Sequence, residues 1–94
     1  MITVVSEVNG DMQIRQYPVS DPLQALRDHI ATLPTEPFID YSYEQIVRLR
    51  QIAAGDVPTE LLPVTHCRGA WVWTTNRALD GAPKPLTCYL IASS

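Results

Sequence analysis

The stretch GAWVWTTN, residues 69–76, decides the fold, because it holds both tryptophans of the chain in a strand-like alternation. In a strand over residues 70–75, successive side chains point to opposite faces, so Trp71 and Trp73 share one face. The other face carries Ala70, Val72 and Thr74. Whether the two rings belong to the core or to a binding surface is the main question that the sequence raises.

The last predicted strand, residues 86–93 (LTCYLIAS), bears on this question because it also has apolar side chains on both faces. Such a pattern is normal for a strand that is buried on both sides. The small Ala70 and Val72 suit close packing under helices, which places Trp71 and Trp73 on the face without helices. The alternative, in which the rings lie in the core under the helices or beneath a loop, stays open.

An aromatic surface of this kind is predicted to bind a partner, since tryptophan and tyrosine anchor many protein interfaces. A contiguous aromatic patch would also be unusual on a solitary monomer. The predicted partner-binding residues are Trp71, Trp73, Tyr89, Arg68 and Arg77.

The N-terminal segment ITVVSEVNGDMQIRQYPV, residues 2–19, predicts a β-hairpin with its turn at Asn9-Gly10. A two-residue loop would pair Val4 with Arg15 and mix the two faces, whereas a three-residue loop keeps the even positions together. We therefore expect a three-residue, bulged turn with Gly10 at positive φ. In that register one face of the hairpin carries Ile2, Val4, Met12 and Ile14.

The first predicted helix has clear end signals. Asp21 is the N-cap, Pro22 occupies the first helical position, Gln24 completes a capping-box pattern and Pro34 ends the helix. The apolar stripe at helical spacing consists of Leu23, Leu26, Ile30 and Leu33.

The second predicted helix begins at Ser42, which forms a capping-box pattern with Gln45, and ends at Gly55. Asp40 is the alternative N-cap. The predicted buried face consists of Ile46, Leu49 and Ala53, with Ile52 and Tyr41 on the solvent side. Arg50 falls on the flank of the buried face, where it either extends to water or binds an anion or a carboxylate.

The remaining segments complete a ββααβββ order. Residues 64–67 read as a short strand and residues 77–85 as an exposed loop. Since the helices do not alternate with single strands, a doubly wound parallel sheet is disfavoured. We expect an α+β fold with an antiparallel sheet of four to five strands and two helices packed on one face. The 94 residues predict a single domain over residues 1–94.

The amino-acid composition disfavours some classes of function. The chain is 46% hydrophobic and 18% charged, as globular proteins are, and its net charge of −3 disfavours a dedicated DNA-binding protein. The acidic residues concentrate in residues 1–60, which suits a basic partner, although ordinary scatter in a small protein explains it too. No membrane span or signal peptide is recognised, so we expect a cytoplasmic protein.

The sequence contains few residues that could bind a metal ion or act as a nucleophile. The soft metal ligands are His29, His66, Cys67 and Cys88, and no pair of them has the spacing of a zinc site. We therefore expect no metal and no cofactor. The two cysteines are expected to be reduced, half-buried thiols, although a disulfide is possible if their strands are neighbours.

The segment WVWTTNRALDGAPKPL, residues 71–86, is partly similar to the W…TPNRALGG…PL stretch of the toxin-binding domain of Xre/ParS-type antitoxins. The similarity covers about one sixth of the chain and requires an inserted residue before Pro85. That domain is helical, whereas a strand and a loop are predicted here, so we do not assign the chain to this family.

These observations favour a small, non-catalytic protein-binding module, such as an inhibitor, an immunity protein or an antagonist from a phage or bacterium. The alternatives are a small enzyme with a pocket between helices and sheet that uses a Cys, a His or Arg50, and a structural subunit that forms a homodimer. An enzyme requires polar groups that converge in a cleft, whereas a binding module requires an exposed apolar surface.

Overall fold

A computed structural model of the protein describes residues 1–75 and 84–93. The strands are β1 (Ile2–Val8), β2 (Asp11–Tyr17), β3 (Leu62–Pro63), β4 (Ala70–Thr74) and β5 (Thr87–Ala92). The helices are α1 (Pro22–Thr32), the 3-10 helix η1 (Glu36–Phe38) and α2 (Tyr43–Ala54). The predicted α+β class with an antiparallel sheet is confirmed.

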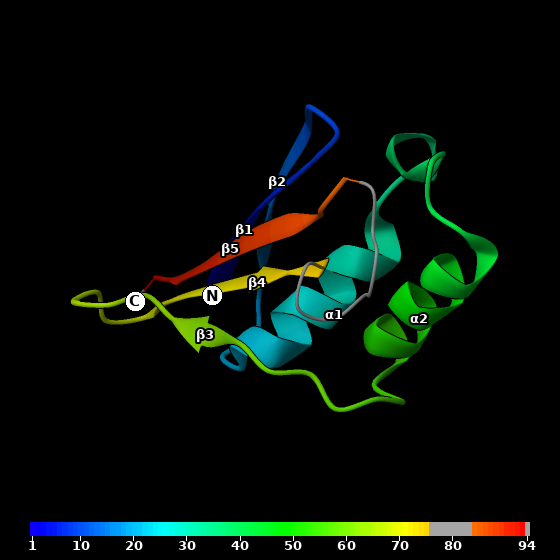
Figure 1. The fold of residues 1–94 in the computed structure, drawn as a ribbon. Helices are drawn as coiled ribbons and strands as arrows, with labels where there is room; N and C mark the ends of the chain where they lie inside the picture. Colours follow the sequence, from blue (N-terminus) through cyan, green and yellow to red (C-terminus); the bar gives the residue numbers. More distant parts are fainter. Residues whose placement is uncertain (76–83, 94) are drawn as a thin grey trace.

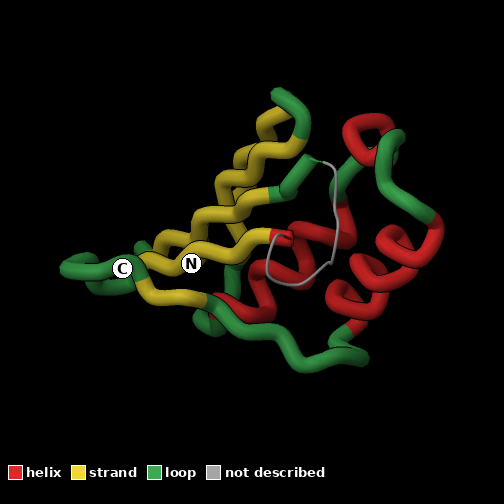
Figure 2. Tube along the Cα trace, in the orientation of Figure 1, coloured by secondary structure: helices red, strands yellow, loops and turns green. Residues whose placement is uncertain are grey.

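The sheet has five strands in the order β2-β1-β5-β4-β3 (Figure 1). β5 lies in the middle and pairs antiparallel with β1 on one side and with β4 on the other. Both α-helices lie on the same side of this single layer of strands (Figure 2). α1 packs against β1 and β5, and α2 packs mainly on α1. Within residues 1–75 and 84–93, the opposite side of the sheet therefore has no helical layer.

The turn of the β1–β2 hairpin differs from the predicted bulge. Val8 pairs with Asp11, so the loop has two residues, Asn9 and Gly10, with φ angles of 50° and 80°. Positive φ at both positions characterises a type I′ turn, whose twist matches that of the flanking strands. Val4 consequently pairs with Arg15, so the expected three-residue register is wrong.

The mixed faces of the hairpin have a physical reason. Ile2, Val4 and Val8 are buried on the helix side of β1. β2 is an edge strand that α1 reaches near Tyr17, whose hydroxyl contacts His29. The rest of the helix-side face of β2 lies beyond the core, so it does not need apolar residues. Met12 and Ile14, predicted to share the face of Ile2 and Val4, point to the opposite face.

α1 follows its predicted ends. Asp21 is the N-cap, and its carboxylate accepts a hydrogen bond from the backbone N–H of Leu23 at 3.1 Å. The predicted capping box is wrong in one part, because the Gln24 amide instead donates to Asp28 at 2.8 Å. The apolar stripe is confirmed: Leu26 and Ile30 are buried, while Leu23 and Leu33 pack partly buried against the core.

α2 has the predicted capping box between Ser42 and Gln45, and Gly55 ends it with a φ angle of 80°. The predicted solvent positions of Tyr41 and Ile52 are wrong, since both side chains are buried. Ile52 follows Leu49 by three positions, which rotates it by only about 60° from Leu49 around the helix. Tyr41 precedes the N-cap, so helical periodicity does not determine its direction.

Tyr41 connects α2 to the sheet. Its hydroxyl donates a hydrogen bond to the backbone carbonyl of Lys84 and lies 3.4 Å from Oγ1 of Thr75. The same Thr75 Oγ1 accepts the backbone N–H of Leu86 at 2.9 Å. The start of α2 is thereby fixed to the ends of the segments that form β4 and β5.

The segment before β4 also differs from its prediction. The strand predicted at residues 64–67 is a turn, and the short β3 precedes it. Val64 still donates its backbone N–H to Ala70, while His66 adopts a positive φ of 64°. A positive φ at a non-glycine residue belongs to turns rather than strands, which accounts for the end of pairing at Pro63.

Candidate functional site

The face of the sheet without helices carries several of the exposed large apolar side chains of the described residues. Along β1 the even residues are buried and the odd residues are half-buried, as expected when the core covers one face only. On the helix-free face, the exposed fractions are 59% for Met12, 65% for Ile14, 50% for Tyr89 and 48% for Ile91. Together with the half-buried Val5 and Val72, these four residues form what we call the apolar patch.

The strand register makes the apolar patch continuous. Val5 pairs with Ile14 on one side and with Tyr89 on the other, and Tyr89 in turn pairs with Val72. Directly paired side chains on one face lie about 4.5–5.5 Å apart at Cβ. A row of apolar side chains thus crosses β2, β1, β5 and β4 without a charged residue in it, and Ile91 adjoins Tyr89 along β5.

Polar residues border the row. Thr3 and Gln16 pair with each other on one side of it, and Glu7 and Thr87 pair on the other. An apolar patch with a polar rim is typical of a protein interaction site. Sequence reasoning missed Met12 and Ile14. The Asn9-Gly10 dipeptide, the strongest signal for a two-residue turn, could have placed them on this face.

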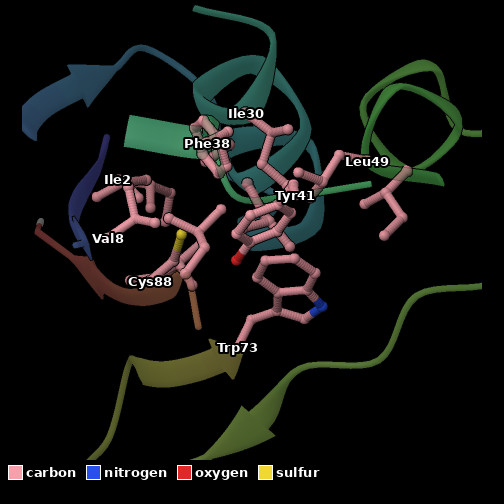
Figure 3. Close-up of a cluster of buried hydrophobic side chains, with 14 residues drawn as sticks. Ile2, Val8, Ile30, Phe38, Tyr41, Leu49, Trp73 and Cys88 are labelled. Carbon is pink, nitrogen blue, oxygen red and sulfur yellow. The ribbon is translucent and has the colours of Figure 1, made fainter. Parts of the chain in front are cut away.

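Trp71 and Trp73 are not part of the apolar patch. They pair with Leu90 and Cys88 on the helix-facing side of the sheet, and Trp73 is only 4% exposed. Figure 3 shows the Trp73 ring directed toward Tyr41 in the interior. Trp71 is partly buried against the same core. The prediction that both rings lie on the face without helices is wrong.

The position of α2 gives the physical reason. α1 lies directly on β1 and β5, where small and medium side chains fill the space. α2 packs mainly on α1, so the space over β4 needs larger side chains to reach the core. Trp73 and Tyr41 occupy that space (Figure 3).

Of the other predicted binding residues, the structure describes Tyr89 and Arg68. Tyr89 is exposed at the centre of the apolar patch, on the face predicted to bind a partner. Arg68 is exposed in the turn before β4. Arg77 and most of the predicted 77–85 loop lie outside the described residues. Tyr89 is therefore the predicted residue that the sheet brings into the apolar patch.

Arg50 lies exposed on α2, at the edge of a mostly apolar cavity of about 240 Å³ between the two helices. Leu33, Phe38 and Ile46 are among the residues that line it. A second cavity of about 260 Å³ lies between α2 and the β3–β4 edge and is lined by Arg48, Glu60 and Trp73 among others. Anion binding by Arg50 stays a prediction.

A chain of polar side chains runs through the core. Nδ1 of His29 lies 2.7 Å from the Tyr17 hydroxyl, and Nε2 lies 2.7 Å from Oγ of Ser6. A neutral imidazole donates at one nitrogen and accepts at the other, so both hydroxyls can be satisfied at once. Burial lowers the pKa of His29 to about 4, with Arg15 adding to the shift, and burial raises the pKa of Tyr17.

This Ser–His pair resembles the contact that activates a serine nucleophile. However, His29 is fully buried and Ser6 is 2% exposed on the helix-facing side of β1, so a substrate cannot reach the Ser6 hydroxyl in this conformation. We therefore interpret Tyr17, His29 and Ser6 as a structural network. Sequence analysis missed it, because the three residues come from separate elements.

The cysteines are both free, but neither is half-buried as predicted, since Cys67 is exposed and Cys88 is fully buried. Burial raises the pKa of the Cys88 thiol to about 12, which removes the thiolate that a nucleophile or a metal ligand needs. Across residues 1–75 and 84–93, no three His, Cys, Asp or Glu side chains come close enough together to hold a metal ion. The described helices are all too short or too polar to cross a membrane.

Comparisons with known proteins give no relative: no family model, curated protein or solved structure matches the chain significantly. The function is therefore argued from the apolar patch and its surroundings.

Proposed function

We propose that the protein is a small, non-catalytic protein-binding module that holds a partner protein on the apolar patch. The observation that carries the proposal is the row Ile14–Val5–Tyr89–Val72, which crosses four strands on the face without helices. Burial of such a row against a partner removes apolar area from water, which is the dominant favourable term in association.

The shape and chemistry of the patch suit a protein partner better than a small molecule. A pleated sheet face offers a broad surface, whereas small-molecule sites are concave and enclose most of the ligand. Tyr89 combines a large apolar ring with a hydroxyl, the combination that makes tyrosine an interface anchor. We expect the partner to present a matching apolar surface with polar groups opposite Glu7, Thr87 and Gln16.

The class that fits is an inhibitor, immunity protein or antagonist that acts by occupying a surface of its partner. Two free cysteines, one of them exposed, agree with a reducing compartment such as the cytoplasm. We expect a cytoplasmic partner, and basic groups on that partner would complement the net charge of −3.

The test compares two matched double variants. Tyr89→Thr with Ile91→Thr alters the patch, and Thr keeps the preference for strand conformation. Ile39→Thr with Tyr43→Thr removes the same two residue types at other exposed positions, 81% and 72% exposed. Each tagged protein captures partners from bacterial cells, and binding of the captured protein is then measured with purified components.

We expect the patch variant to lose the partner, with the dissociation constant raised at least tenfold, and the control variant to bind like the wild type. Thermal melting must show that both variants remain folded. If the folded patch variant retains its partner with unchanged affinity, the apolar patch is not the binding surface.

A further inference from the structure

In the part of the chain that the structure describes, β2 is an edge strand with a free side. In the sheet order β2-β1-β5-β4-β3 it has β1 as its single neighbour, and it extends over seven residues. The opposite edge, β3, has two residues and ends at Pro63, which cannot donate to a further strand. Proteins commonly protect long edges, because unpaired N–H and C=O groups are a template for pairing with another chain.

The register shows which backbone groups face outward. A two-residue turn closed by Val8 and Asp11 makes these two residues a hydrogen-bonded pair, and the pattern repeats at every second residue. The odd residues of β2 thus direct their backbone groups to β1. Met12, Ile14 and Gln16 direct theirs to the free edge.

The side chains of β2 are arranged symmetrically about Gln13, with apolar residues on one face and opposite charges on the other. On the helix-free face, Met12 and Ile14 are more than half exposed. On the other face, Asp11 and Arg15 flank Gln13, with Arg15 exposed and Asp11 partly exposed. The strand therefore carries one acid and one base at equal distances from Gln13.

We propose that two copies of this chain form a homodimer in which their β2 strands pair antiparallel, with the twofold axis at Gln13. In this register Asp11 lies opposite Arg15 of the partner subunit, and the symmetry makes this contact twice. Met12 lies opposite Ile14 of the partner subunit, again twice. Each Met12–Ile14 pair joins residues whose backbone groups face the edge, so it exchanges both N–H···O bonds.

The charges of Asp11 and Arg15 favour the register with its axis at Gln13 over the register with its axis at Ile14. An axis at Ile14 would place Ile14 against itself and Asp11 opposite Tyr17 of the partner subunit, so neither Asp11 nor Arg15 would face an opposite charge. Opposite charges placed directly across strands stabilise pairing, and like charges oppose it. The Gln13 axis also keeps the helix-free faces of both copies on one side, so the two apolar patches join across a ten-stranded sheet.

This inference goes beyond the proposed function and does not depend on it. The test is sedimentation equilibrium of the whole chain from micromolar to millimolar concentration. We expect a dimer that dissociates on dilution. Arg15→Asp places two carboxylates opposite each other at both ends of the strand pair, and we expect the dimer dissociation constant to rise at least tenfold. Asp11→Arg should have the same effect through opposed guanidinium groups.

The double variant Asp11→Arg with Arg15→Asp reverses both charges and should restore the dimer to within a few fold of the wild type. Arg48→Asp changes an exposed arginine on α2 and serves as the charge control, with no expected effect. The patch variant Tyr89→Thr with Ile91→Thr lies on β5, away from the edge, and should also leave the dimer intact.

A chain that stays monomeric at millimolar concentration overturns the proposal. So does a dimer that the single charge changes leave intact, or that the double variant fails to restore. A dimer lost through Tyr89→Thr with Ile91→Thr, but unaffected by Arg15→Asp, would indicate face-to-face packing of two sheets instead of edge pairing.

Discussion

Burial of His29 makes the free energy of unfolding depend on pH. The pKa is about 4 in the folded state and 6.5 in an unfolded chain. Between these values the unfolded chain binds a proton that the folded chain does not. The contribution of neutral His29 to the free energy of unfolding is therefore fully present above pH 6.5 and decreases as the pH falls. We expect the free energy of unfolding to be about 2 kcal/mol lower at pH 5 than at pH 7, at about 1.4 kcal/mol per pH unit.

Urea denaturation at the two pH values measures this difference. His66→Gln is the control, because it removes the exposed histidine and should preserve the pH dependence. An NMR titration of the His29 ring tests the cause directly. Equal denaturation midpoints at pH 5 and pH 7, together with a ring that titrates near pH 6.5, would show that His29 is not held neutral by burial.

Trp73 is a second residue whose burial can be tested. Trp73→Ala removes a nearly fully buried ring next to Tyr41 and leaves a cavity that the sheet and α2 cannot easily close. We expect a loss of about 3–5 kcal/mol in the free energy of unfolding. Since small domains are stable by about 5–15 kcal/mol in total, the variant should be largely or partly unfolded at 37 °C.

Circular dichroism melting measures this loss, and Tyr43→Ala is the matched control. Tyr43 is an aromatic residue that is mostly exposed, so its truncation should change stability by no more than about 0.5 kcal/mol. If Trp73→Ala and Tyr43→Ala have the same melting temperature, the Trp73 ring is not buried in the core.

At the scale of elements, the β1–β2 turn sets the faces of the hairpin and therefore the composition of the apolar patch. Gly10 has a φ of 80°, and an added Cβ would meet no atom within 4 Å. The cost of Gly10→Val is therefore conformational, because a β-branched residue resists positive φ. We expect a decrease of about 1–2 kcal/mol in the free energy of unfolding.

Chemical denaturation of Gly10→Val and Gly10→Asn provides the measurement. Asn tolerates positive φ, so Gly10→Asn should lose much less. If both variants unfold at the wild-type midpoint, Gly10 does not adopt the left-handed conformation.

The ends of the elements could be predicted because their signals are local. Asp21 before Pro22, the Ser42–Gln45 box and Gly55 each act within a few residues, and all occur where predicted. The turn at Asn9-Gly10 was located correctly, but its length was inferred from the wrong assumption that both strands bury the same face under the helices. β2 contradicts that assumption because it is an edge strand that lies mostly beyond α1.

At the scale of the whole molecule, the α+β class followed from the order of elements, whereas the strand order did not. No local signal indicates that β5 pairs with β1, because the paired residues are far apart in sequence, as Ile2 and Ala92 are. The position of the tryptophans depends on the space between α2 and β4. No short sequence signal predicts this space, because it results from tertiary packing. Tyr89 was predicted on the correct face, while Met12 and Ile14 required the true hairpin register.

The central position of β5 also has a consequence for biosynthesis. A ribosome makes β5 after the other four strands, yet β1 and β4 have no contact with each other in the sheet except through it. At about 5–20 residues per second, the nascent chain carries a β1 strand that has not yet paired with β5, and the apolar stripes of both helices, for several seconds. The five-stranded sheet is therefore completed only after residues 87–92 have left the ribosome, and until then these apolar segments can bind chaperones.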